Sequence, residues 1–184
     1  MKKKLRTVCL LLFVCVICSC ASQPVVPPSS AWRYEKDALN FYLKADSQLN
    51  LYEGMPHTLH ICVYQLRDPN TFNQFSEDTN GLYKLLECGR FDTSVASSKR
   101  FFIQPGETKD FALDRAEGAK YVALVAGYSL LQKEGLIRLF EIPIISERTG
   151  MLKLSKVTKP GPLNVHLILG SHEIQKIEGN STDE

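Results

Sequence analysis

Apolar and polar side chains alternate along several short stretches of this chain, which is the two-residue period of a half-buried β-strand. The segment 39–46 places Leu39, Phe41 and Leu43 on one face, and the segment 163–169 repeats the pattern. Because one face of each segment is apolar and the other mostly polar, both are predicted to be strands that cover a core on one side.

Two other segments are apolar on both faces. They are 58–66 (TLHICVYQL) and 121–128 (YVALVAGY), and both contain β-branched and aromatic residues, which favour strands. Runs of this kind are expected in the middle of a sheet, so both are predicted to be central strands. Further strands, bounded by turn residues, are expected at 99–104, 108–113 and 136–145.

One region has the spacing of a helix. Between residues 71 and 87 the bulky residues lie three apart, at Phe72 and Phe75 and again at Leu82 and Leu85, with an Asn-Gly pair as an interruption. Closely spaced strands, Pro/Gly turns and one short helical insertion together predict an all-β protein. The expected fold is an antiparallel β-sandwich of two sheets.

The first twenty residues have the pattern of an export signal that ends in a lipid-bearing cysteine. Four basic residues precede an apolar run at 8–17, which is too short to cross a bilayer, since that requires about twenty residues. The residues Ile17-Cys18-Ser19-Cys20 then resemble the lipobox of bacterial lipoproteins. Cys18 and Cys20 are both candidates for lipidation. Cys20 is the predicted site, because cleavage before Cys18 would place the bulky Ile17 directly before the cleavage site. A plain signal peptide with incidental cysteines is the alternative.

Cleavage before Cys20 divides the chain into four regions. They are a lipoprotein signal peptide at 1–19, a lipidated Pro/Ser-rich tether at 20–37, a β-sandwich domain at 38–174 and a flexible tail at 175–184. The composition of the tether favours extended geometry and cannot bury a core. The residue after the lipidated cysteine is Ala21. Lipoproteins in which this residue is not Asp are generally sorted to the outer membrane, so the resemblance to this pattern implies an outer-membrane location.

Loss of the signal changes the composition of the working protein. It removes four basic residues and no acidic one, so the formal charge falls from +2 to −2, which gives no support for nucleic-acid binding. Of the six cysteines, Cys62 and Cys88 then remain outside the signal and the lipidation site. In an oxidising compartment these two can form a disulfide, but their sequence positions are equally consistent with two small buried side chains.

No group of residues has the spacing of a catalytic or metal site. The sequence contains neither a G-x-S-x-G nor an H-E-x-x-H motif. His57 and His60 are three apart, which on a strand points them to opposite faces. We therefore predict no enzyme, no catalytic residue and no metal site.

The order of these segments resembles the TssJ family, the outer-membrane lipoproteins of the bacterial type VI secretion system. Its N-terminal strand pair is matched by Leu49-Asn50, Gly54 and Val63-Tyr64-Gln65-Leu66. A Phe-rich helical stretch, a turn and an apolar strand follow in the family's order, at Phe72 and Phe75, at Pro105-Gly106 and at 121–128. The chain departs from the family after Tyr128, where many members continue with Arg and Trp.

This resemblance implies a transthyretin-like β-sandwich that binds the periplasmic C-terminal domain of TssM and fastens the membrane complex to the outer membrane. It implies no cofactor besides the lipid and no small-molecule substrate. The family binds TssM mainly through the loop between its first two strands, which is 47–55 here. The candidate partner-binding residues are therefore Asn50, Leu51, Tyr52, Glu53, Gly54 and Met55.

The residues of this loop fit an interface on their own chemistry. Leu51, Tyr52 and Met55 are apolar or aromatic side chains in a connector, and such side chains are typical anchors of protein interfaces. The alternative is that Leu51 and Tyr52 fold back onto the edge of the sandwich.

A second hypothesis is a β-sandwich lipoprotein of another class, either a ligand-binding module or a periplasmic chaperone. A chaperone would use an exposed strand edge to complete the sheet of its partner. Neighbouring genes for TssM and sheath components would favour the anchor, and pilin or polysaccharide genes would favour this second hypothesis.

The lipid prediction is tested by Cys20→Ser. Because the lipid supplies the hold on the membrane, the variant is expected to move from the membrane fraction to the soluble fraction of cells. Fractionation and immunoblotting measure this, and a variant that stays in the membrane fraction would contradict the lipoprotein assignment.

Overall fold

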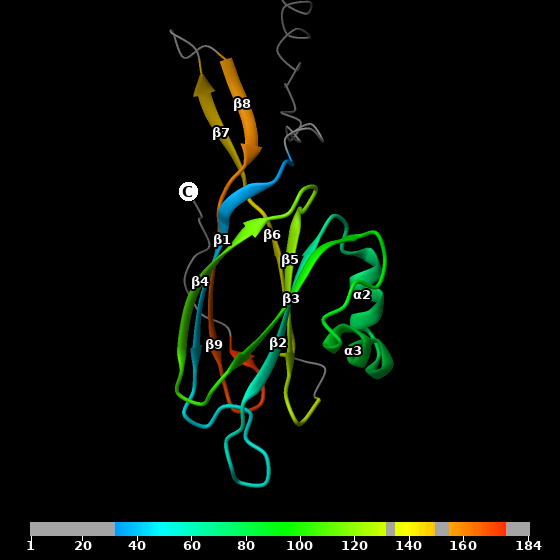
Figure 1. Cartoon of the computed structure of the whole chain (residues 1–184), viewed down its shortest axis with the longest axis vertical. Helices are drawn as coiled ribbons and strands as arrows, with labels where there is room; N and C mark the ends of the chain where they lie inside the picture. Colours follow the sequence, from blue (N-terminus) through cyan, green and yellow to red (C-terminus); the bar gives the residue numbers. More distant parts are fainter. Residues whose placement is uncertain (1–31, 132–134, 150–154, 176–184) are drawn as a thin grey trace, which may run out of the picture.

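The computed structural model describes residues 32–131, 135–149 and 155–175. They form two four-stranded sheets that pack face to face, a two-stranded ribbon and two helices (Figure 1). The prediction of an all-β sandwich with a helical insertion is confirmed. The predicted signal peptide, Cys20 and the tail beyond Gln175 lie outside the described residues.

The first sheet has the strand order β10-β9-β1-β4. Its strands are β10 (Ile174–Gln175), β9 (Leu163–Leu169), β1 (Glu35–Ala45) and β4 (Thr108–Arg115). Strand β1 pairs antiparallel with β4 but parallel with β9, so the expectation of purely antiparallel pairing is wrong for one pair. The two strands run the same way because the chain reaches β9 from the end of the sandwich where β1 begins (Figure 1).

The second sheet has the order β3-β2-β5-β6. Its strands are β3 (Val95–Ile103), β2 (Leu59–Leu66), β5 (Tyr121–Gly127) and β6 (Ile137–Glu141). Strands β2 and β5 lie in the middle and are buried on both faces, apart from His60 and the two ends of β5. The prediction of two central strands is therefore confirmed.

The core between the sheets is built from the alternating residues of the strands. Leu39, Phe41 and Leu43 of β1 are at most 1% exposed and face Ile61 and Val63 of β2 within one apolar cluster. Each such side chain contributes about 1.5–3 kcal/mol when it leaves water. The two-residue period of β1 therefore decides which face of the first sheet points inward.

The helices α2 (Asn70–Ser76) and α3 (Thr79–Leu86) cover the outer face of the second sheet. A second apolar cluster lies beneath them and includes Phe72, Leu85 and Tyr64. The Tyr64 hydroxyl donates a 2.7 Å hydrogen bond to the Leu85 carbonyl oxygen, and burial is the main cause that raises the pKa of Tyr64 to about 12. Neither helix in the described part of the chain is long and apolar enough to cross a membrane.

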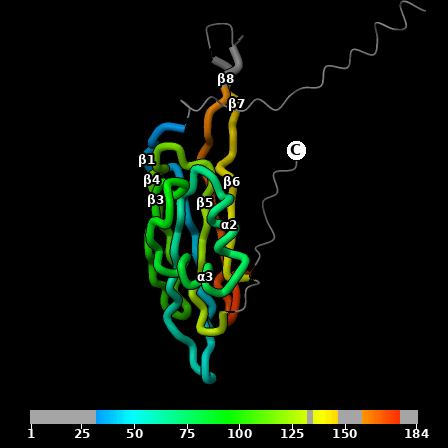
Figure 2. Tube along the Cα trace, turned by 90° about the vertical axis from the view of Figure 1, so that its right-hand side faces the viewer, coloured from blue at the N-terminus to red at the C-terminus, as the bar shows by residue number. Residues whose placement is uncertain are grey.

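The segment 136–145 is two strands rather than the single strand predicted. Strand β6 ends at Glu141, and after Pro143 the chain forms β7 (Ile144–Thr149), which pairs with β8 (Ser155–Pro160). Pro143 has no N–H for a sheet, and its carbonyl oxygen accepts a 2.7 Å hydrogen bond from the Gly161 N–H. The β7–β8 ribbon extends beyond the sandwich along its long axis (Figure 2).

The folded domain begins before residue 38, the boundary expected from the sequence. Trp32 is buried in the core, and its carbonyl oxygen accepts a 2.7 Å hydrogen bond from Gly118. The buried Arg115 guanidinium lies 5.8 Å from the Trp32 ring centroid and 2.9 Å from a Glu35 carboxylate oxygen. Residues 32–37, expected in the tether, are thus held on the sandwich by packing and charge.

The contact between the two helices is tested by Gly81→Ala. The added Cβ would lie 2.0 Å from the Phe75 carbonyl oxygen, so the backbones must move apart, at an expected cost of about 1–3 kcal/mol in the free energy of unfolding. Gly89→Ala is the matched control, because its Cβ meets nothing within 4 Å, and it should change stability by less than about 0.5 kcal/mol. Urea unfolding measures both, and equal stability of the two variants would contradict the packing.

Candidate functional site

The connection between β1 and β2, residues 46–58, forms one end of the molecule. Figures 1 and 2 both place it at the opposite end of the long axis from the first described residues and from the β7–β8 ribbon. This end holds the six residues that were predicted to bind a partner. The structure gives these residues different roles.

The tip of the connection is a tight hairpin closed by Tyr52 and Met55. Their backbones exchange two hydrogen bonds, of 2.9 Å from the Tyr52 N–H and 3.0 Å from the Met55 N–H. Glu53 and Gly54 between them have φ angles of +49° and +76°, and positive φ at both central residues is the requirement of a type I′ turn. Gly54 adopts this conformation without strain, which accounts for its place in the loop.

The hairpin presents two large apolar side chains to solvent. Tyr52 is 43% exposed and Met55 is 60% exposed. The Tyr52 ring lies edge-on to the half-buried His57 ring, at 6.3 Å between centroids, so the tyrosine does not fold back onto the sandwich. Leu51 is half-buried, and its N–H donates to the Ser171 carbonyl oxygen at 2.9 Å.

Asn50 lies beneath the hairpin instead of on its surface. It is 5% exposed and has a φ of +47°. Its side-chain oxygen accepts a 2.7 Å hydrogen bond from the Ser129 N–H, and its amide donates to the Thr58 carbonyl oxygen at 3.2 Å. Asn50 was predicted to contact a partner, but its hydrogen bonds hold the base of the hairpin, and Leu49 beside it is buried in the core.

Two further loops lie against the base of the hairpin. Ser129 belongs to the connection after β5, where Leu130 is 42% exposed, and Ser171 belongs to the turn between β9 and β10. These contacts could not be predicted from the sequence, because nothing in the segments of Ser129 and Ser171 indicates that they meet the β1–β2 connection.

Cys62 and Cys88 form a disulfide, with 5.1 Å between their Cα atoms. The sequence left open whether these cysteines form a disulfide or are two separate buried side chains, and the structure has the disulfide. The bond joins strand β2 to the segment that follows α3, on the side of the sheet that the helices cover.

His60 lies beside this disulfide. Its Nε2 is 3.1 Å from the Cys88 sulfur and 3.5 Å from the Cys62 sulfur. The three side chains could in principle surround a metal ion, but the sulfurs are bonded to each other and offer no thiolate. This neighbourhood was not predicted, although the sequence contains a signal for it, because an H-x-C pair on one strand points to the same face.

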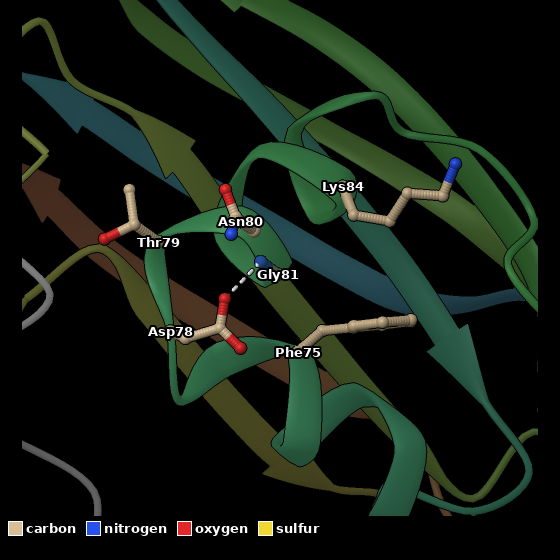
Figure 3. A pocket seen from close by; sticks show the side chains of 6 residues that line it. All are labelled: Phe75, Asp78, Thr79, Asn80, Gly81 and Lys84. Carbon is tan, nitrogen blue, oxygen red and sulfur yellow. Dashed lines mark hydrogen bonds between the residues drawn. The ribbon is translucent and has the colours of Figure 1, made fainter.

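Figure 3 shows a shallow hollow at the junction of α2 and α3. The Asp78 carboxylate there accepts a 2.8 Å hydrogen bond from the Gly81 N–H, which caps the first turn of α3. The other residues that line it are Phe75, Thr79, Asn80 and Lys84. This hydrogen bond is ordinary helix capping, and the hollow is open to solvent, so it supports no enclosed ligand site.

The geometry defines a β-sandwich domain with a hydrogen-bonded hairpin at one end. Its fold is shared with solved structures of low sequence identity. Serratia marcescens Lip, a membrane-bound component of the type VI secretion system, is 24% identical, with a TM-score of 0.57 over 77% of this chain and 98% of that chain. The lipoprotein TssJ1 from Pseudomonas aeruginosa is 18% identical, with a TM-score of 0.56 over 81% of this chain and 98% of its own.

A third similar chain comes from the structure described as "T6SS protein TssM C-terminal domain (869-1107) from EAEC". It is 15% identical, with a TM-score of 0.54 over 77% of this chain and 98% of that chain. No curated protein matches the sequence.

Residues 37–157 match the family described as "Type VI secretion lipoprotein, VasD, EvfM, TssJ, VC_A0113". The match covers most of the described domain, from the third residue of β1 into β8. The chain belongs to this family of type VI secretion lipoproteins, as the resemblance of its segments indicated.

The role of Asn50 is tested by two substitutions. Asn50→Gly keeps the left-handed backbone but loses both side-chain hydrogen bonds, so the free energy of unfolding should fall by about 1–2 kcal/mol. Asn50→Ala also loses the backbone preference and should cost about 1 kcal/mol more. Urea unfolding and hydrogen exchange at the Ser129 amide measure these effects. Asn40→Ala, which removes an exposed bond to Asn164, is the control, and the prediction is wrong if it is as destabilising as Asn50→Gly.

Proposed function

We propose that this chain is anchored to the outer membrane by lipid on Cys20 and binds the periplasmic C-terminal domain of TssM through the hairpin 52–55. In this role the protein fastens the membrane complex of the secretion system to the outer membrane, on the periplasmic face. The observation that carries the proposal is the rigid hairpin with its exposed Tyr52 and Met55.

The position of the hairpin suits a protein held between a membrane and a partner. The tether leads into Trp32 at one end of the domain, and β1 runs from there to the hairpin at the other end (Figure 1). A strand of 11 residues spans about 35 Å. A lipid-anchored domain in this orientation holds its hairpin away from the membrane surface, where the periplasmic part of a partner is accessible.

The structure of the hairpin favours tight binding. Ordering a loop on binding costs free energy, and a loop that is already ordered avoids much of that cost. Here the two backbone hydrogen bonds between Tyr52 and Met55 and the buried Leu49 and Asn50 keep the tip in one conformation. Exposed aromatic and Met side chains on such a tip have the chemistry of interface anchors.

The second hypothesis, a chaperone that adds a strand to its partner, has less support. Strand β3 lies at an edge of its sheet, but Lys99 and Arg100 on it are exposed. Charged side chains on an edge strand, Lys above all, are a common protection against pairing with another chain.

The proposal is tested by the double substitution Tyr52→Ala with Met55→Ala. Both side chains lie on the surface and neither enters the core, so the domain should remain folded. If they are the anchors, the Kd for the purified periplasmic C-terminal domain of TssM should rise at least about thirtyfold. Isothermal titration calorimetry measures this change.

Tyr83→Ala is the matched control, because Tyr83 is also an exposed tyrosine, at 58%, but lies on α3. It should leave the Kd unchanged. Wild-type affinity of the Tyr52/Met55 variant would place the interface elsewhere, and weak binding of the Tyr83 variant would place it on the helical side.

A further inference from the structure

The Cys62–Cys88 disulfide lies on the side of the second sheet that the helices cover, and the His60 imidazole lies beside its sulfur atoms. His60 and Cys62 are two residues apart on β2, and both side chains face the segment that carries Cys88. The family resemblance and the proposed function give no role to this group of three side chains. Thiol–disulfide exchange requires a sulfur that a thiolate can reach, and it is faster when the leaving thiolate is stabilised.

We propose that the Cys62–Cys88 bond is an exchangeable disulfide that reacts with a dithiol at the Cys88 sulfur, with His60 stabilising the thiolates that are released. This inference does not depend on the binding of TssM. The reacting partner is defined by its chemistry as a pair of neighbouring thiols, of the kind that reduces disulfides.

The two cysteine residues differ in exposure. Cys62 is 0% exposed, under the helices and between strands β3 and β5, whereas Cys88 is partly exposed. An attacking thiolate cannot reach a fully buried residue, so the proposed point of attack is Cys88 and not Cys62. Cys62 is then the leaving group of the first step.

The surroundings favour a thiolate. His60 Nε2 lies within 3.5 Å of both sulfurs and can donate a hydrogen bond to either one. Arg100 of β3 lies opposite Cys62 in the sheet register, and its guanidinium donates to the Glu87 carbonyl oxygen at 2.6 Å. A nearby cation and an imidazole donor both lower the pKa of a cysteine thiol, and a more acidic thiol is a better leaving group.

The surroundings of His60 favour the neutral form of its imidazole. Burial, and then the positive charge of Arg100, lowers the pKa of His60. Arg100 comes from β3, Glu87 from the segment after α3, and the neighbour on β5 is Gly127, which has no charge. The neutral imidazole is thus favoured while the disulfide is intact, and a new thiolate beside it supplies the negative charge that favours a donated proton.

The reaction balances with a dithiol as the reductant. Its first thiolate attacks the Cys88 sulfur, the bond between the protein sulfurs breaks, and Cys62 leaves with the electron pair and takes up a proton. The second thiol of the dithiol loses its proton and attacks its own sulfur in the mixed disulfide, which releases Cys88 as a thiolate that then takes up a proton. The protein gains two electrons and two protons, and the dithiol becomes a disulfide.

The helices should stay in place when the bond opens. Phe72 and Leu85 remain buried against the sheet, and the hydrogen bond from Tyr64 to the Leu85 carbonyl oxygen does not involve the cysteines. Exchange can therefore take place in the folded protein, where it releases the segment at Cys88 without unfolding the domain.

The test uses the folded, disulfide-bonded protein with dithiothreitol as the dithiol. Free thiols are trapped with maleimide and counted by mass spectrometry. In native buffer the rate of reduction should be proportional to the dithiothreitol concentration. His60→Phe, which keeps a ring against Phe102 but removes the nitrogen atoms, should reduce at least about tenfold more slowly.

His166→Phe is the matched control. His166 also lies on a strand with its ring near an aromatic ring, 5.6 Å from Tyr42, but on the first sheet, and this variant should reduce at the wild-type rate. If His60→Phe does not fold, His60→Leu, which also has no side-chain donor, takes its place with the same expectation. After reduction, alkylation of Cys88 by iodoacetamide should begin at lower pH in the wild type than in the His60 variant, which a purely structural role of His60 would not produce.

Three results would overturn the proposal. A rate that does not depend on dithiothreitol concentration would mean that reduction requires prior unfolding. Equal rates for the wild type and the His60 variants would exclude a role for the imidazole. With glutathione as a single thiol, a mixed disulfide mapped to Cys62 instead of Cys88 would contradict the predicted point of attack.

Discussion

The burial of one face of strand β1 is the constraint on which the rest of the structure depends. Leu39, Phe41 and Leu43 point into the core, and β1 has partners on both sides, β4 and β9. This arrangement fixes the direction of the strand as well as its register. It therefore fixes where the chain enters the sandwich and where it leaves toward the hairpin, at opposite ends of the domain (Figure 1).

Rigidity at the hairpin follows from the same arrangement. The chain leaves β1 through Leu49, which is buried in the core, and Asn50, which is hydrogen-bonded to the loop after β5. The tip beyond them needs only two residues with positive φ to close. The buried base therefore orders a tip whose own side chains, Tyr52 and Met55, make few contacts with the rest of the protein. Such a tip can bind a partner without a large entropic cost.

Much of the fold could be predicted from the sequence. Strands buried on one face alternate apolar and polar residues, and strands buried on both faces are apolar throughout, so both patterns indicate burial directly. What could not be predicted depends on contacts between distant segments. The buried position of Asn50 arises from Ser129, and the ordering of Trp32 arises from Arg115 and Gly118. The break in 136–145 was visible at Pro143, but the β8 strand that pairs beyond it has no strong alternation of its own. In the candidate site, Tyr52 and Met55 are exposed and Asn50 is buried, and partner binding by any of these residues stays a prediction.

Contact between the hairpin and TssM can be detected by site-specific crosslinking in cells that carry the whole secretion system. A photoreactive phenylalanine analogue is placed at Tyr52 or, for comparison, at Tyr83 on α3, and crosslinked products are identified by immunoblotting. If the hairpin binds TssM, we expect a crosslink to the periplasmic domain of TssM from position 52 and none from position 83. A crosslink from position 83 and none from position 52 would contradict it.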